Sequence, residues 1–160
     1  MKKKTKQIIF LFSFITLSLL TGYLGSQLTG VSMSETYLSL SSKPIFSPPS
    51  WIFAPVWFIL YVLMGISAYL IWRVRTKENV KKPLVFFFVQ LILNLLWPII
   101  FFGLGQYFWA FAEIMILLIT IIMMILSFSK VSKVSSYLLF PYLLWVGFAS
   151  MLNLAIAFTK

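Results

Sequence analysis

The sequence predicts an all-α membrane protein, folded as a single bundle of five transmembrane helices. Of its 160 residues 61% are apolar, 19% are aromatic and only 10% are charged. A soluble domain of this length could not bury so much apolar surface, so the bilayer must be its solvent. Uncharged apolar stretches long enough to cross a bilayer cover residues 8–28, 48–72, 84–102, 106–128 and 134–158. No composition shift divides them, so residues 1–160 are expected to form one domain.

The first stretch follows a lysine-rich start, which suits either a cleaved signal peptide or a retained helix. A cleavage site needs small residues in a small-x-small pattern, but Tyr23 lies two positions before Gly25. We therefore interpret the stretch as a retained helix. Ser18, Gly22 and Ser26 recur every fourth residue and form a small-residue stripe, which suits either a contact within the bundle or a dimer seam.

Prolines mark the starts of the next helices. Ser47 before Pro48 and Lys82 before Pro83 suit helix starts, because proline is tolerated in a first turn. Pro55 would remove the hydrogen bond to the carbonyl of Trp51, which predicts a distorted turn. In a membrane such a break survives only where the freed carbonyl lies against protein or a cavity, so this aromatic entry indicates a pocket. Further on, Gly103 and Gly105 predict a tight turn between the third and fourth helices.

The cations predict the orientation. One side of the membrane would hold Lys2, Lys3, Lys4, Lys6, Arg73, Arg75, Lys77, Lys81, Lys82, Lys130 and Lys133. The other would hold only Lys43 and Lys160. The positive-inside rule then places the N-terminus in the cytoplasm and the C-terminus outside the cell membrane. Because the net charge of +10 sits at segment ends rather than on a soluble unit, no nucleic-acid partner is expected.

Several kinds of chemistry are excluded by composition. The chain has no cysteine and no histidine, so disulfides, zinc sites and histidine-ligated haem are excluded, and neither a metal nor a cofactor is expected. Its three acids, Glu35, Glu78 and Glu113, lie too far apart in sequence for a carboxylate pair. Glu113 alone falls inside a span. It is expected to be a neutral acid hydrogen-bonded to a neighbouring helix, or else a functional group.

Aromatic and amide side chains converge on three of the predicted helices. At spacings of three and four, one face of each helix presents Phe53, Trp57 and Tyr61; Gln90, Asn94 and Trp97; or Tyr142, Trp145 and Ala149. Tryptophans can instead form interfacial belts, as expected for Trp51, Trp72 and Trp109 near helix ends, and Gln90 and Asn94 can simply connect helices. Because each face carries a tryptophan together with a phenol or an amide, we predict a shared ligand pocket.

The ordered motifs resemble those of the TspO/MBR proteins, the tryptophan-rich sensory proteins related to the mitochondrial translocator protein. They are KP at 43–44, SPPSWIFAPVW at 47–57, LYVLMG at 60–65, QLILNLLW at 90–97, FFG at 101–103, AEI at 112–114, PYLLWVGFA at 141–149 and LN at 152–153. The resemblance covers nearly all of the chain after the first helix. It implies five transmembrane helices, a homodimer, and a pocket closed by the loop after the first helix.

The resemblance also implies ligands and site residues. Family ligands include porphyrins such as protoporphyrin IX, benzodiazepine-site drugs and, in animals, cholesterol. Trp57 and Trp145 would be the pocket tryptophans, and the same pocket would be lined by Phe53, Tyr61, Gln90, Asn94, Trp97 and Ala149. The chain departs from the family at Phe46, where tryptophan is common, and at Phe158, where the cholesterol motif needs tyrosine. Cholesterol is therefore not expected as a ligand.

Three functions remain open from the sequence. The first is a membrane receptor or carrier for a flat hydrophobic tetrapyrrole, with protoporphyrin IX as its ligand. The second is a light-dependent porphyrin-degrading enzyme, which the resemblance suggests. In it Trp57 and Trp145 would be the candidate catalytic residues, since no nucleophile or acid–base pair is present. The third is a structural or small-solute transport role. The sequence shows no inverted repeat of the usual transporter type, which counts against it.

Overall fold

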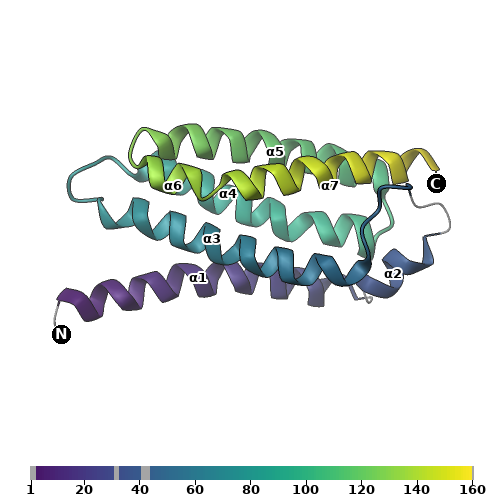
Figure 1. Ribbon diagram of the computed structural model, residues 1–160, viewed down its shortest axis with the longest axis horizontal. Helices are drawn as coiled ribbons and strands as arrows, with labels where there is room; N and C mark the ends of the chain where they lie inside the picture. The colour runs from purple at the N-terminus through teal and green to yellow at the C-terminus, as the bar shows by residue number, and fades with distance from the viewer. Residues whose placement is uncertain (1–2, 31–32, 41–43, 160) are drawn as a thin grey trace.

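The computed structural model describes residues 3–30, 33–40 and 44–159, and helices make up most of this part of the chain (Figure 1). The order is α1 (Lys3–Leu28), α2 (Met33–Ser39), the 3₁₀ turn η1 (Ser50–Ile52), α3 (Phe53–Arg73), α4 (Lys81–Pro98), the π-helical turn η2 (Ile99–Gly103), α5 (Tyr107–Ser129), α6 (Lys133–Tyr137) and α7 (Phe140–Thr159). Five segments are long and apolar enough to cross a membrane: Lys4–Leu28, Ser50–Arg73, Lys81–Gly103, Tyr107–Ser129 and Lys133–Thr159. The predicted all-α, five-helix membrane architecture is confirmed.

Prolines account for the differences in helix boundaries. The second span does not begin at Pro48: a 3₁₀ turn starts at Ser50, and α3 follows from Phe53. Pro55 is the third residue of α3, in the first turn, where no intrahelical donor is required. The expected distortion at this entry is therefore a 3₁₀ turn that precedes the helix. In the same way α4 begins at Lys81 rather than residue 84, with Pro83 in its first turn.

The last span is divided, although the sequence predicted one helix over residues 134–158. A turn at residues 138–139 separates α6 from α7, and Pro141 is the second residue of α7. Because Pro141 has no N–H, it cannot bond to the carbonyl four residues earlier, and a continuous helix is interrupted there. After Pro98 the chain continues as the π-helical turn η2, closed by the bond from Leu104 N to Ile99 O of 2.9 Å. Gly105 has φ +62°, as the predicted tight turn requires.

Spans that follow one another along the chain run in opposite directions, whereas α1 and α4, which also pack together, run in the same direction. In Figure 1, α1 lies beside α3, and α5 lies beside α7; α4 is packed between α1 and α5. The main core contains Met64, Ile71, Phe87, Ile121 and Val146, each almost fully buried. Much of the outer surface is apolar, as a bundle surrounded by lipid requires.

The two ends of the bundle differ in charge. Figure 1 shows the start of α1 at the same end as the α3–α4 and α5–α6 connections, whereas α2 and the C-terminal end of α7 lie at the opposite end. The first end therefore gathers Lys4, Lys6, Arg73, Arg75, Lys77, Lys81, Lys82, Lys130 and Lys133. Lys2, Lys43 and Lys160, which also entered the orientation prediction, lie outside the described residues.

Glycines bring α1 against its neighbours. A Cβ added to Gly65 of α3 would lie 2.5 Å from the Cα of Ile15, and one added to Gly22 would lie 2.3 Å from the Cε2 of Tyr61. Ser18 is fully buried. Within the described chain, Ser18 and Gly22 of the small-residue stripe therefore make contacts inside the bundle, which was one of the two roles expected for the stripe.

Candidate functional site

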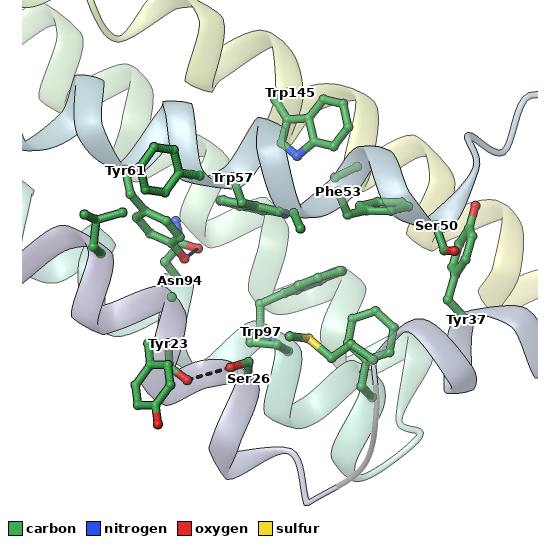
Figure 2. Close-up of a pocket in the computed structure, with 18 residues that line it drawn as sticks. Tyr23, Ser26, Tyr37, Ser50, Phe53, Trp57, Tyr61, Asn94, Trp97 and Trp145 are labelled. Atoms are coloured by element: carbon green, nitrogen blue, oxygen red, sulfur yellow. Dashed lines mark hydrogen bonds between the residues drawn. The ribbon is translucent and has the colours of Figure 1, made fainter.

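A cavity of about 380 Å³ lies between α1, α3, α4 and α7, at the end of the bundle that carries α2 (Figure 2). Its size falls within the range of pockets for drug-sized ligands. It is lined by Leu19, Gly22, Tyr23, Ser26, Met33, Tyr37, Ser50, Phe53, Ala54, Trp57, Phe58, Tyr61, Asn94, Trp97, Pro98, Phe102, Trp145 and Ala149. Apart from a few hydroxyls and one amide, this lining is apolar and largely aromatic.

Most of the predicted site residues line this cavity. They are Phe53, Trp57, Tyr61, Asn94, Trp97, Trp145 and Ala149. Gln90 and Tyr142 do not line it, although they were predicted to. Both are completely buried behind the cavity wall, because their faces of α4 and α7 turn toward each other. The aromatic and amide faces of three helices therefore converge, but part of each face is used for packing.

Gln90 and Tyr142 belong to a buried hydrogen-bond chain that starts at the cavity wall. The Tyr61 hydroxyl donates to Asn94 Oδ1 at 3.1 Å, and Asn94 Nδ2 donates to the Tyr142 hydroxyl. The Tyr142 hydroxyl in turn donates to Gln90 Oε1 at 2.8 Å. This chain joins α3, α4 and α7 at the inner end of the cavity. It confirms the interpretation that the two amides connect helices, while Asn94 also faces the cavity.

The tryptophans of the lining are held by other aromatic rings. Trp57 stacks on Tyr61 with centroids 5.5 Å apart, and Trp145 meets the edge of Phe53 at 5.8 Å. Figure 2 shows Trp57 and Trp97 on opposite sides of the cavity. Trp97 is fixed by its Nε1, which donates to Asn153 Oδ1 at 3.1 Å. The result is a pair of aromatic walls with a space between them.

The short helix α2 covers the outer end of the cavity. The Tyr37 hydroxyl donates to the carbonyl of Pro48 at 2.9 Å, and its ring meets that of Phe53 at 5.1 Å. Burial raises the pKa of the Tyr37 phenol, so it stays protonated and able to donate at neutral pH. This contact attaches α2 to the proline-rich entry of α3 and adds Met33 and Tyr37 to the lining.

The sequence prediction named no lining residue from α1 or α2, although the resemblance implied that the loop after the first helix, which contains α2, closes the pocket. Leu19, Tyr23 and Ser26 of α1 line the cavity, as do Met33 and Tyr37 of α2. The small-residue stripe was the available signal, since Gly22 within it brings α1 against Tyr61. A stripe of this kind indicates close approach without showing which neighbour is approached.

Glu113 does not make the hydrogen bond to a neighbouring helix that was expected. It is only 8% exposed, yet neither carboxylate oxygen has a hydrogen-bond partner in the described part of the chain. Two buried hydroxyls of the spans, those of Ser150 and Thr120, donate to carbonyls of their own helices, at Gly147 and Ile116. Two tryptophans lie where a membrane-interface belt was expected. Trp51 and Trp109 are at helix starts and are 72% and 71% exposed.

Comparisons with known proteins agree with this architecture. The model of the TspO/MBR family matches residues 14–159. The chain is 42% identical to the tryptophan-rich protein TspO of Chlorobaculum tepidum, over 94% of this chain and 96% of that protein. It is 40% identical to the translocator protein of Bos taurus, over 88% and 83%. It is 34% identical to the tryptophan-rich sensory protein of Cereibacter sphaeroides, over 74% and 73%.

Proposed function

Because this chain belongs to the TspO/MBR family, we propose that it binds flat hydrophobic ligands, foremost tetrapyrroles such as protoporphyrin IX, in the cavity between α1, α3, α4 and α7. Its relatives carry the names sensory protein and translocator protein. A sensory, regulatory or transport role in the membrane follows from that membership, with ligand binding as its molecular step.

One observation carries the proposal: three tryptophans, Trp57, Trp97 and Trp145, line one apolar cavity. Indole rings offer large flat surfaces that stack on an aromatic macrocycle, and each well-placed aromatic pair adds about 1 kcal/mol beyond simple burial. A few polar groups at the cavity edges, such as Asn94 and Ser50, suit ligands whose polar atoms lie at their periphery.

The uncharged character of the described lining restricts how such a ligand can be oriented. None of the described residues that line the cavity is charged. A carboxylate buried without a cation costs several kcal/mol, so the two propionates of protoporphyrin IX cannot lie at the inner end. The macrocycle therefore lies with its apolar edge toward the inner end of the cavity and its carboxylates toward the membrane surface.

Tryptophan fluorescence tests the binding function directly. Purified protein in lipid nanodiscs is titrated with protoporphyrin IX in the dark, and quenching is compared between the wild type and two variants. Trp57→Phe keeps an apolar ring, so affinity should fall only by about fivefold, which is roughly 1 kcal/mol. Trp109→Phe, which changes an exposed ring outside the cavity lining, should leave the affinity unchanged. Equal loss in both variants, or no saturable quenching in the wild type, would reject the site.

A second candidate function is light-dependent degradation of the bound porphyrin. Trp57 and Trp145 favour it, because both indoles line the cavity in which an excited macrocycle would be held. Indole is readily oxidised and can exchange an electron with an excited neighbour, and the described lining residues include no nucleophile–base or acid–base pair.

A further inference from the structure

The helix α1 does not stay beside α3 along its whole length. In its middle it is pressed against α3, where a Cβ on Gly65 would lie within 3 Å of the backbone of Ile15 and Phe14. Toward its C-terminal end it lies against α4 instead, since a Cβ on Gly25 would lie 3.2 Å from Pro98. Farther along, a Cβ on Gly103 of η2 would lie 3.1 Å from the carbonyl oxygen of Thr29. The end of α1 and the start of α3 therefore diverge.

The cavity occupies the space left by this divergence. From α1 it is lined by Leu19, Tyr23 and Ser26, and from α3 by Phe53, Trp57 and Phe58, among others. Two of these side chains are also on the outer surface: Tyr23 is 60% exposed and Phe58 is 58% exposed. Side chains that line a cavity and face outward at the same time mark its opening. In Figure 2, Tyr23 and Ser26 of α1 lie across the cavity from Phe53 and Trp57 of α3.

The depth of this opening places it in lipid. Tyr23 lies five residues before the end of α1, and Phe58 lies five residues after the start of α3. At 1.5 Å per residue, both are about 8 Å inside their helix ends. The exposed Trp51 stands at the entry to α3, where tryptophan marks the boundary between headgroups and hydrocarbon. The opening between Tyr23 and Phe58 therefore faces acyl chains.

We infer that the cavity opens sideways into the bilayer between the C-terminal part of α1 and the N-terminal part of α3, and that it takes its ligand from the lipid phase. The ligand class is a flat molecule with an uncharged core that partitions into hydrocarbon, and any charged groups stay at the membrane surface. The inference rests on the proposed function for its ligand. It adds the route, and it assigns α2 to covering the end of the cavity rather than to admitting the ligand.

Ligand kinetics distinguish this lateral route from an entrance beneath α2. The chain has no cysteine, so single cysteines can be labelled without background. A bulky maleimide is attached to Tyr23→Cys, Phe58→Cys, Met33→Cys on α2, or Phe12→Cys, an exposed α1 position outside the lining. Association and dissociation of protoporphyrin IX are then measured by stopped-flow fluorescence in nanodiscs. Labels at 23 and 58 should slow both rates at least tenfold and change the Kd less, whereas the label at 12 should leave both rates near wild type. The label at 33 occupies part of the lining, so it should speed dissociation without slowing association.

A reaction that needs no porphyrin tests the same opening independently. Ala149→Cys lines the cavity and is otherwise buried, and Ala110→Cys, which is fully buried outside the cavity, is its control. A maleimide carried on a phospholipid acyl chain should label position 149 faster than a water-soluble maleimide does, and should not label position 110. Faster labelling by the water-soluble reagent, or slower porphyrin exchange only with the label at 33, would overturn the lateral route. A wild type that binds no porphyrin, together with an Ala149→Cys variant that passes the labelling test, would reject the proposed ligand and support the opening.

Discussion

Asn94 has two tasks at the inner end of the cavity, because it lines the space and also joins Tyr61 to Tyr142. Replacing Asn94 by Leu keeps α4 apolar but removes the acceptor of the Tyr61 hydroxyl and the donor to the Tyr142 hydroxyl, which retains its bond to Gln90. Leaving a buried polar group unsatisfied costs about 1–3 kcal/mol, so the variant should be less stable by about that amount. The measurement is thermal unfolding in detergent without ligand.

A double-mutant cycle identifies the cause of that loss. Tyr61→Phe removes one end of the same bond, so the double variant should lose less stability than the sum of the two single variants. If Asn94→Leu weakened ligand binding without lowering stability, Asn94 would not connect the helices as the structure indicates.

The two cavity tryptophans separate binding from photochemistry. Trp57→Phe and Trp145→Phe both keep an aromatic ring in the lining, so binding in the dark should weaken only modestly, by about 1 kcal/mol. Phenylalanine is far harder to oxidise than tryptophan, so a light-driven loss of porphyrin that runs through these indoles should fall much more than binding does. The measurement is porphyrin absorbance over time under illumination, at saturating protein. Equal loss with wild type, variants and empty detergent would remove the enzymatic function and leave a binding protein.

At the scale of helices, two glycines provide a matched pair. Gly65 of α3 has backbone atoms of α1 within 3 Å of where a Cβ would stand, whereas nothing lies within 4 Å of that position at Gly147 of α7. Gly65→Ala should therefore push α1 away from α3 and destabilise the protein by about 1–3 kcal/mol, since packed backbone cannot relax as a side chain can. Gly147→Ala should instead be neutral or stabilising by up to about 1 kcal/mol, because alanine favours a helix. Unfolding in detergent measures both, and equal effects would contradict the close contact between α1 and α3.

The spans were predictable because crossing the hydrocarbon core of a bilayer requires a long segment without charges. A segment without charges for about 20 residues has one stable fate in a bilayer, and all five predicted segments correspond to observed spans. Boundaries at prolines were less predictable. Pro48 and Pro55 both precede apolar sequence, and the sequence alone does not say which of them opens the helix. At Pro141 a predicted continuous helix is divided, because proline reads equally as a first-turn residue or as a break.

The site was predictable where residues of one helix share a face. Spacings of three and four brought Trp57, Asn94 and Trp145 to the cavity. The same spacing could not show that Gln90 and Tyr142 bond to each other behind the wall, since the rotation of one helix against another depends on packing over the whole interface. Nor could it place Tyr23, which reaches the cavity because α1 leaves α3 for α4.

For the whole molecule, the implied homodimer stays a prediction that analytical ultracentrifugation in matched-density detergent would test. The outer faces of α5 and α7 carry apolar side chains such as Ile116, Ile119 and Met151, which are exposed in the single chain. Lipid and a second copy of the chain satisfy such faces equally well in a bilayer, because lipid tails are as apolar as the side chains.

The orientation in the membrane is the broadest prediction. The end of the bundle that carries the start of α1 and the α3–α4 connection holds nearly all of the described cations, and the positive-inside rule assigns such an end to the cytoplasm. Five spans then place the C-terminus, α2 and the covered end of the cavity outside. A reporter active only in the cytoplasm should work after Lys77, and one active only outside should work after Lys160.

Moving positive charge from one end of the bundle to the other supplies the control for this topology. Exposed cations of the α3–α4 connection and the start of α4, such as Arg75, Lys77 and Lys81, can be changed to Gln without touching the core. With those charges removed and lysines added near the C-terminal end, a fraction of the molecules should invert, since the balance of cations decides which loops remain inside. If the reporters after Lys77 and after Lys160 were found on the same side of the membrane in the unaltered chain, an odd number of crossings between them would be contradicted. Reporters that show opposite sides but the reverse assignment would keep the five-helix bundle and place the cavity at the cytoplasmic face.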